Sequence, residues 1–511
     1  NWRQALARGG VFEATPTRDV SVSSDAANLR PSAPRLQGGG AFTVIAFPHS
    51  YYGDGRGAAL PWMQEIPDPV TKLSWNSWAE ISLKKAKEMG VVFGDVIKIE
   101  TESGSIEISV FPRGGVRDDV VAIPIGQGHT VGHYASMAGD DQPGVARGAN
   151  VAAILPAAHD EAGGQAFLST SAKVSKAGRF RRLALSQWTD NQRKRGLAQE
   201  VSIHDLAKGG MAHFAAVANA SEDSGHGEAA AGGHHFEGPP FEFDPKNDAE
   251  PGQPYRWGMT IDNDKCTGCS ACIAACYIEN NGVIVGELEA IRHREMHWIR
   301  IERYVGEGND DVREDSERRP TPDGEILGHA EVRHLPMLCQ HCGAAPCEAV
   351  CPVIATYHSP EGINGMIYNR CVGTRYCANN CVYKVRRFNY FDYGRLNWPG
   401  LLGLMLNPDV TVRNQGVMEK CSFCSQRIEA ARQPAKDEGR EIGDGEVVTA
   451  CQQACPSDAI TFGNYKEESS SVSTLARQGE DRAYHALQEL NTRPAVTYLA
   501  QVRREKNEGV H

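Results

Sequence analysis

CTGCSACIAACYIENN, residues 266–281, contains four cysteines at the spacing Cys-x2-Cys-x2-Cys-x3-Cys. Three cysteines at this spacing can wrap one tight loop around a metal–sulfur core, and the fourth then points towards a second core. The pattern is typical of proteins whose iron–sulfur clusters come in pairs. It predicts a fold organised around paired clusters.

Three further groups of cysteines follow, and none of the 15 cysteines lies before residue 266. The later groups are Cys339-x2-Cys342-x4-Cys347-x3-Cys351, then Cys371-x5-Cys377-x3-Cys381, then Cys421-x2-Cys424 with Cys451-x3-Cys455. Every cysteine belongs to one of the four groups. A cysteine-free half followed by a cysteine-rich half predicts two unlike modules.

Disulfide bonds and structural zinc are the competing explanations of so many cysteines. Disulfide frameworks suit short exported domains, and cysteines so close in sequence rarely meet the geometry of a bridge. Zinc prefers four-ligand sites built from two Cys-x2-Cys pairs, which would suit the fourth group but not the first. Iron–sulfur clusters explain all four groups, so we favour them.

The pairing of the groups follows from the way two-cluster modules work, since the last cysteine of each motif binds the cluster of the partner motif. Pairing the outer groups predicts a first site from Cys266, Cys269, Cys272 and Cys455 and a second site from Cys276, Cys421, Cys424 and Cys451. Pairing the inner groups predicts a third site from Cys339, Cys342, Cys347 and Cys381 and a fourth site from Cys351, Cys371 and Cys377.

The fourth site lacks one ligand, because Thr374 stands where a cysteine would restore the regular spacing. A hydroxyl is a hard and poor ligand for this kind of iron. We expect the iron at that corner to be absent, which gives a [3Fe–4S] cluster; the alternative is a [4Fe–4S] cluster in which Thr374 or water fills the corner. Nearby Arg375, Lys384, Arg386 and Arg387 form either a solvated surface or a set of charges that raises the potential of this cluster.

The chain has 511 residues, which is enough for two or three domains, and its composition is that of a globular protein. Its net charge of −11 argues against nucleic acid as the main partner. No apolar run reaches the roughly 18 residues that a membrane-spanning helix needs. Because the first residue is Asn1 rather than Met, we expect either a processed N-terminus or a preceding stretch of polypeptide.

The cysteine-free half has a pattern of its own. Residues 82–89 read as a short helix that ends at Gly90. Residues 96–101 and 105–111 alternate around a turn as a hairpin, and residues 120–125 read as a buried strand before the loop 126–129. At the other end of the chain we expect one helix over residues 481–490 and a strand over residues 496–500.

Five strings resemble the four-cluster subunit of molybdopterin oxidoreductase complexes, a superfamily that includes polysulfide, dimethyl-sulfoxide and nitrate reductases. They are CTGCSACIAACYIENN (266–281), WIRIERY (298–304), LCQHCGAAPCEAVCP (338–352), RCVGTRYCANNCVYKVRRFNYFDY (370–393) and KCSFCSQRI (420–428). The Thr374 variant most resembles the B subunit of alternative complex III. The upstream half is similar to the C-terminal barrel domain of molybdopterin oxidoreductases, with Trp62, Trp75 and Trp78 matching its aromatic pattern.

The resemblance implies an α+β fold, in which a β-barrel-like domain precedes a double two-cluster ferredoxin-like domain. The expected divisions are an extended segment (1–40), the barrel domain (41–205), a flexible Gly/His-rich linker (206–254), the four-cluster domain (255–465), and a C-terminal helix and tail (466–511). The histidines of residues 221–240 fit a linker better than a metal site, and residues 309–319 read as a solvated loop.

The resemblance also implies the function of an electron-transfer subunit in a membrane-bound quinol oxidoreductase. A polytopic membrane subunit would oxidise quinol, and multihaem and monohaem c-type cytochrome subunits would receive the electrons. The chain would carry three [4Fe–4S] clusters, one [3Fe–4S] cluster and no molybdenum cofactor, with Gln127 and His129 structural. It would lie on the outer, periplasmic face of the bacterial cytoplasmic membrane and hold no catalytic residue.

Two other functions stay open. One is the iron–sulfur subunit of a molybdenum-containing reductase such as a polysulfide reductase, and the other is a non-redox scaffold whose clusters only hold the fold together.

The apolar residues 398–407 are likewise open to two interpretations. They form either a buried loop or a docking surface against the membrane subunit.

Overall fold

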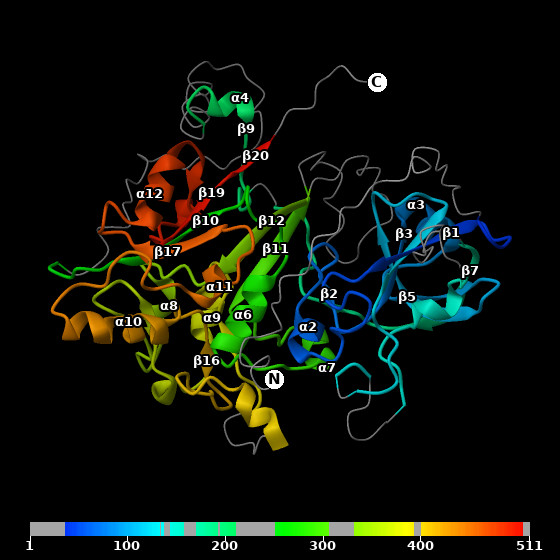
Figure 1. Cartoon of the computed structure of the whole chain (residues 1–511), viewed down its shortest axis with the longest axis horizontal. Coiled ribbons are helices and arrows are strands. Elements are labelled where there is room, and N and C mark those ends of the chain that lie inside the picture. The colour runs from blue at the N-terminus through cyan, green and yellow to red at the C-terminus, as the bar shows by residue number, and fades with distance from the viewer. Residues whose placement is uncertain are drawn as a thin grey trace, which may run out of the picture.

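The computed structural model describes residues 36–132, 134–136, 144–157, 170–192, 195–210, 251–305, 332–392 and 400–503. The barrel strands, blue and cyan in Figure 1, lie on one side of the molecule, and the cysteine-bearing region, green to red, lies on the other. No helix in these ranges has the length and hydropathy needed to cross a bilayer. The histidines of 221–240, the charged run 309–319 and most of the expected extended segment fall outside the described residues.

Six strands close a barrel in the order β1, β6, β3, β5, β4, β7. They are β1 (Phe42–Pro48), β3 (Trp78–Ser82), β4 (Asp95–Glu100), β5 (Ser105–Arg113), β6 (Val120–Ile125) and β7 (Thr170–Phe180). β1 pairs with β6 and β3 with β5 in parallel, whereas the other neighbours are antiparallel. Apolar side chains such as Val44, Ile97 and Ile123 fill the interior, so the barrel has a continuous core.

The local sequence predictions for the barrel are confirmed. α3 (Leu83–Met89) begins after Ser82, whose hydroxyl accepts a hydrogen bond from the Lys85 N–H at 3.0 Å, and it ends at Gly90 with a φ of +62°. β4 and β5 form the predicted hairpin, and β6 leads into the predicted loop. The smaller elements around the barrel are α2 (Pro61–Glu65), β2 (Leu73–Ser74), η2 (Val151–Ile154) and β8 (Ala184–Leu185), with β2 antiparallel to β8.

The cysteine-bearing region is built on a four-stranded sheet and three two-stranded ribbons. The sheet has the order β17 (Ile460–Asn464), β10 (Trp257–Asp262), β19 (Val496–Leu499) and β18 (Ala483–Tyr484). The ribbons are β11 (Ile299–Val305) with β12 (Val332–Leu338), β13 (Thr356–His358) with β14 (Asn364–Met366), and β15 (Arg387–Phe388) with β16 (Met418–Glu419). A single buried core that includes Trp257, Phe423 and Tyr498 joins the sheet to the cysteine loops.

Short helices next to the cysteines form two packed pairs. α6 (Ala271–Glu279) packs against α11 (Ala450–Gln453), and α8 (Pro346–Ala349) packs against α9 (Tyr376–Asn380). The helices of the outer cysteine groups therefore meet each other, as do those of the inner groups. The other helical elements are α7 (Glu287–Ile291), η5 (Tyr368–Arg370), η6 (Gly400–Met405), α10 (Ser425–Asp437) and α12 (Ser471–Gln478).

The single helix predicted over residues 481–490 is wrong. The 3-10 turn η7 (Glu480–Arg482) runs into β18, and a second turn, η8 (Gln488–Leu490), follows. β18 pairs with β19, and the Tyr484 hydroxyl accepts a hydrogen bond from the Asn263 amide at 2.9 Å, so tertiary contacts outweigh local helix propensity. β19 confirms the predicted strand, while α12, capped by the Ser470 hydroxyl, was not predicted.

The segment that follows the barrel and the C-terminal end of the described chain meet beside the cysteine-bearing region. β9 (Glu200–Ser202), followed by α4 (Ile203–Leu206), pairs in parallel with β20 (Gln501–Arg503), as Figure 1 shows. Ala198 and Val201 are buried in the same core as the sheet of that region. This segment therefore contributes to the packing of the cysteine-bearing region rather than to the barrel interior.

A buried carboxylate joins the barrel side to the cysteine-bearing side. Glu65, in α2, accepts hydrogen bonds from the backbone N–H groups of Val285 and Gly286, each at 3.2 Å. It also accepts one from the Trp75 indole at 2.8 Å. Burial raises the pKa of Glu65 to about 8.

A second carboxylate, Glu287, gathers cations from the barrel side. It pairs with Arg147 at 2.9 Å and with Arg181 at 3.2 Å, and it accepts a hydrogen bond from the Asn76 amide at 2.8 Å. The Glu287 and Arg147 side chains are both nearly buried. We call the contacts of Glu65 and Glu287 between the barrel side and the cysteine-bearing side the seam. Water screens these partly buried groups only incompletely.

Candidate metal centres

The cysteines predicted for the first and second sites line two separate cavities. The first cavity is lined by Cys266, Cys269, Cys272 and Cys455. The second cavity is lined by Cys276, Cys421, Cys424 and Cys451. All 15 cysteines are free, so none forms the disulfide bonds of the alternative explanation. The structure thus brings together the same sets of cysteines that the spacing predicts.

The third and fourth sets also gather. All four cysteines of the third site are buried. Burial raises the pKa of the Cys342 thiol well above its ordinary value, and the other three cysteines of that set raise it further. Burial likewise raises the pKa of the Cys377 thiol, and the neighbouring Cys371 and Cys351 raise it further. The cysteines of each set therefore lie close enough together to shift one another's pKa values.

The donor sets fit iron–sulfur clusters. Burial, followed by the neighbouring thiols, raises the pKa values of Cys272 and Cys276 well above the ordinary range. Iron would supply the positive charge that lets such crowded thiols ionise. In the described ranges, no three His, Cys, Asp or Glu side chains converge on a point that a single metal ion, such as zinc, could occupy. The cysteines of a cluster bind different irons and need no such point.

The backbone around Thr374 repeats the backbone around Cys269. The residue before each is a glycine with a φ of +72°, and the residues after them, Ser270 and Arg375, have φ values of +60° and +61°. α6 begins directly after Ser270, and α9 begins directly after Arg375. Thr374 therefore stands at the position in the loop that a cysteine takes in the first motif.

The two Cys-Pro motifs are also built alike. The Ala355 N–H donates to the Cys351 sulfur at 3.2 Å, and the Ala459 N–H donates to the Cys455 sulfur at 3.3 Å. Burial alone would raise the pKa of Cys351, but backbone N–H groups outweigh it and leave the pKa below its ordinary value. Hydrogen bonds of this kind stabilise the thiolate that iron needs.

The four sites lie in a row. Each is joined to the next by nearby cysteines, and the joining pairs are Cys272 with Cys451, Cys421 with Cys339, and Cys347 with Cys377. At one end Cys269 is exposed, and at the other end Cys351 and Cys371 are partly exposed. The row of neighbouring sites thus runs from the exposed Cys269 to the partly exposed cysteines of the fourth site, and Cys421 of the second site is partly exposed as well.

The basic residues within and after the third cysteine group have different environments. Arg375 and Lys384 are exposed, as a solvated surface would require. Arg386, in contrast, is 6% exposed and donates a hydrogen bond to the Cys347 sulfur at 3.2 Å. For Arg386, the interpretation as a solvated surface residue is therefore wrong. Its residue type and sequence position alone did not separate it from its neighbours.

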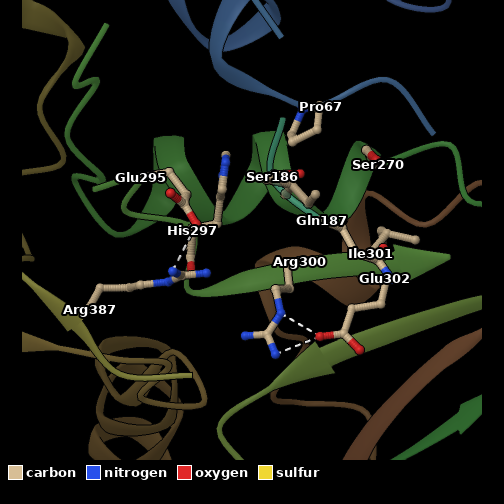
Figure 2. Close-up of a pocket in the computed structure, with 11 residues that line it drawn as sticks. Pro67, Ser186, Gln187, Ser270, Glu295, His297, Arg300, Ile301, Glu302 and Arg387 are labelled. Atoms are coloured by element: carbon tan, nitrogen blue, oxygen red, sulfur yellow. Dashed lines mark hydrogen bonds and ion pairs between the residues drawn. The ribbon is translucent and has the colours of Figure 1, made fainter. Parts of the chain in front are cut away.

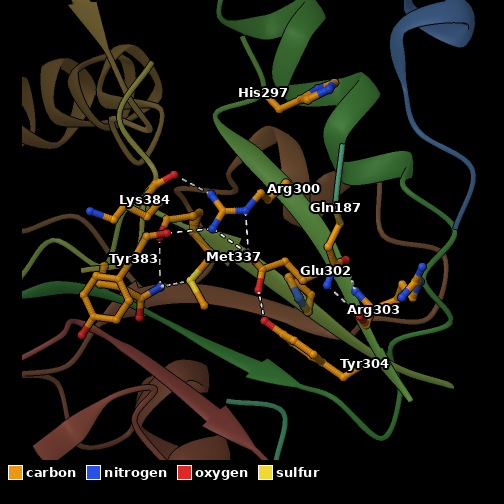
Figure 3. Close-up of polar contacts among 12 residues, drawn as sticks. Gln187, His297, Arg300, Glu302, Arg303, Tyr304, Met337, Tyr383 and Lys384 are labelled. Carbon is orange, nitrogen blue, oxygen red and sulfur yellow. Dashed lines mark hydrogen bonds and ion pairs between the residues drawn. The ribbon is translucent and has the colours of Figure 1, made fainter. Parts of the chain in front are cut away.

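Sequence reasoning missed a second arginine, Arg300, which connects β11 to the loop after the third cysteine group (Figure 3). Its guanidinium donates to the carbonyl oxygens of Tyr383 and Lys384, each at 2.7 Å, and to Glu302 at 2.7 Å. The other oxygen of Glu302 accepts a hydrogen bond from the Tyr304 hydroxyl. This network holds the loop of the third site against the ribbon.

A cavity of about 50 Å³ lies beside the first site, at the seam with the barrel (Figure 2). Pro67 enters it from the barrel side, and Ser270, next to Cys269, enters from the other side. Arg387 pairs with Glu295 at 3.0 Å and donates to a backbone carbonyl at 3.1 Å. The barrel side therefore reaches the immediate surroundings of the first site.

Gln127 and His129 lie in the loop after β6. The Gln127 side chain is buried, and its amide donates to the side-chain oxygen of Gln64 at 2.8 Å, so it ties the loop after β6 to α2. The Nε2 atom of His129 is buried without a hydrogen-bond partner among the described residues. The structural role expected of His129 stays a prediction.

Comparison with known proteins matches both halves of the chain. The model described as "Molydopterin dinucleotide binding domain" matches residues 65–172, and the model described as "4Fe-4S dicluster domain" matches residues 265–355. Among solved structures, acetylene hydratase from Pelobacter acetylenicus matches with 19% identity and a TM-score of 0.19, covering 27% of this chain and 18% of that protein.

Several curated proteins are similar over about half of the chain. The "Menaquinone reductase, iron-sulfur cluster-binding subunit" of Nitratidesulfovibrio vulgaris is 40% identical over 48% of this chain and 89% of that protein. An iron–sulfur subunit of a "Putative dimethyl sulfoxide reductase" from Halobacterium salinarum is 34% identical over 48% and 78%. The "Hdr-like menaquinol oxidoreductase iron-sulfur subunit 1" of Archaeoglobus fulgidus is 32% identical over 48% and 82%.

The α+β fold expected from the sequence is confirmed by the barrel and by the cluster-domain match. The paired cysteine sets, the two domain matches and the high coverage of the relatives all agree. The chain therefore belongs to the family of iron–sulfur cluster-binding subunits of oxidoreductase complexes, and in this member a barrel of the molydopterin dinucleotide binding type precedes the cluster region.

Proposed function

We propose that the chain is the electron-transfer subunit of a membrane-bound quinol oxidoreductase of the alternative complex III type. A polytopic membrane subunit would oxidise quinol, and multihaem and monohaem c-type cytochrome subunits would accept the electrons. Two relatives are named for menaquinone or menaquinol chemistry, which supports the link to a quinol. The proposed location is the outer, periplasmic face of the cytoplasmic membrane.

The observation that carries this proposal is Thr374 at a cysteine position, at one exposed end of a row of four cysteine sets. The proposed ligands are all 15 cysteines, in the four sites defined above, holding three [4Fe–4S] clusters and one [3Fe–4S] cluster. When bound, such clusters supply one-electron redox steps. The protein's own groups hold the row in place and set the charge around it.

A second candidate is the iron–sulfur subunit of a molybdenum-containing reductase. One relative is named for a putative dimethyl sulfoxide reductase, and another, from Salmonella typhimurium, for a tetrathionate reductase. Metal analysis of the intact complex separates the candidates. The proposal expects companions that bind quinol and haem and no molybdenum, whereas stoichiometric molybdenum would support the second candidate.

Thr374→Cys tests the fourth site directly. The substitution places a thiol at the open corner, so we expect one additional iron per chain and loss of the three-iron EPR signal of the oxidised protein. Thr374→Ser is the matched control, because it keeps a hydroxyl and should leave iron content and signal unchanged. Wild-type protein without a three-iron signal, and with the same iron content as Thr374→Cys, would contradict the proposed cluster.

A further inference from the structure

Arg386 carries a positive charge in the interior of the cysteine-bearing region. Its residue is only 6% exposed, and its Nη2 donates to the Cys347 sulfur at 3.2 Å. The same nitrogen donates to the Asn364 side-chain oxygen at 3.0 Å, and Nη1 donates to the Thr356 hydroxyl at 3.1 Å. A guanidinium stays charged at any pH that a protein tolerates, so this charge is fixed.

The guanidinium lies where the third and fourth sites meet. Cys347 belongs to the third set and Cys377 to the fourth, and the two pack in one buried cluster with Met418. Arg386 also opposes, by its charge, the rise that burial causes in the pKa of Cys377. One cation therefore acts on cysteines of two neighbouring sites.

The charge is not cancelled by an ion pair within the described residues. The acceptors of the guanidinium are two sulfur atoms, from Cys347 and Met366, and two neutral oxygens. The nearest carboxylate contact in this network, that of Glu348, goes to the Asn364 amide rather than to Arg386. In low-dielectric surroundings an uncancelled charge acts strongly on its neighbours.

We propose that Arg386 raises the reduction potentials of the third and fourth clusters together, and that it acts more strongly on the third. This inference rests on the cluster assignment of the proposed function. Adding an electron makes a cluster more negative, so a nearby fixed cation stabilises the reduced form and raises the potential. The third cluster feels the larger effect because the guanidinium donates directly to one of its ligands. Arg386 thus acts through the clusters rather than on a substrate. By raising the potential of the third cluster, it lets that cluster accept electrons next to a fourth cluster of high potential.

The test is a redox titration of the intact complex, with the EPR signals of the two clusters followed separately. In Arg386→Gln, the ratio of reduced to oxidised third cluster at a fixed ambient potential should fall at least tenfold, which is 59 mV for a one-electron couple. The fourth cluster should shift in the same direction by less. Arg386→Lys keeps the charge and should restore most of the shift.

Arg375→Gln is the matched control. It removes the same charge one residue away from Thr374, but from an exposed side chain that water and salt screen. We expect a shift smaller than threefold there. Equal shifts in the two Gln variants, or unmoved potentials in Arg386→Gln at full iron content, would overturn the inference.

A second variant covers loss of iron in Arg386→Gln. Asn364→Asp leaves the arginine in place and sets a carboxyl group between it and Glu348, so both potentials should fall at a pH at which that carboxyl group is ionised. Potentials that stay unchanged across the whole pH range of the titration would overturn the inference. Iron content and the wild-type EPR signals are measured first. If the wild type lacks the signals of the two clusters, the cluster assignment itself fails, whereas signals that are present but unmoved in the variants reject only the role of Arg386.

Discussion

Glu419→Ala should destabilise the protein strongly, because it leaves a guanidinium buried without its partner. The Glu419 and Arg413 side chains are both 0% exposed, and their charged atoms are 2.9 Å apart. Removing one partner of such a pair costs about 3–5 kcal/mol. The carboxylate also accepts hydrogen bonds from the Trp298 indole at 3.1 Å and the Asn389 amide at 3.0 Å, and both donors would lose their acceptor. We therefore expect a loss of at least about 4 kcal/mol, close to a thousandfold in the folding equilibrium.

The assay is anaerobic denaturant unfolding, followed by the visible absorbance of the clusters and by circular dichroism. Glu438→Ala is the matched control, since the pair of Glu438 with Arg440 is 60% and 39% exposed and should contribute little to stability. Replacing Glu419 and Arg413 together by Met should cost less than Glu419→Ala alone, because no charge is left unpaired. A Glu419→Ala protein as stable as the Glu438→Ala protein would refute the reasoning. Iron loss should begin at the second site, whose Cys421 lies two residues beyond Glu419.

Three further predictions concern the seam and the surface. Glu65 has a pKa of about 8 in the folded protein, above its ordinary value of 4.5. The folded protein therefore holds this proton more tightly than the unfolded chain does. The stability of the protein should fall as the pH rises from about 4.5 through 8. Glu65→Gln should flatten that slope in melting curves, and an unchanged slope would contradict the assignment. Glu287→Ala leaves Arg147 nearly buried without its carboxylate and should cost about 3 kcal/mol in the same melts, whereas an unchanged midpoint would mean that the seam is held elsewhere. Leu404 is 80% exposed, so Leu404→Glu should release the protein from membranes at full iron content if residues 398–407 dock there; release together with iron loss would favour a packing role.

The elements that could be predicted are those whose signal is local. The spacing of the cysteines predicts which of them share a cluster, and each of the first two predicted sets lines a cavity of its own. α3 could be predicted from Ser82 and Gly90, because the cap residues at both ends of a short helix are close in sequence. The position of Thr374 in its loop followed from the same regular spacing.

The elements that could not be predicted depend on contacts between distant residues. The tail forms β18 rather than a helix because its partner strand lies a dozen residues further on and Asn263 binds its tyrosine. Arg386 and Arg375 are alike in sequence, and only the fold buries one and exposes the other. The partners of Glu65 across the seam, Val285 and Gly286, lie more than 200 residues away, so no local pattern could indicate that seam.

The parallel ladder between β9 and β20 has a consequence for biogenesis. Its strands, residues 200–202 and 501–503, flank the whole cysteine-bearing stretch. The ladder cannot form until the last of these residues has left the ribosome, so all 15 cysteines are synthesised before the two strands can pair. Iron can therefore be inserted before β9 and β20 pair. A chain truncated before β20 should bind its iron but lose it more readily than the full chain does.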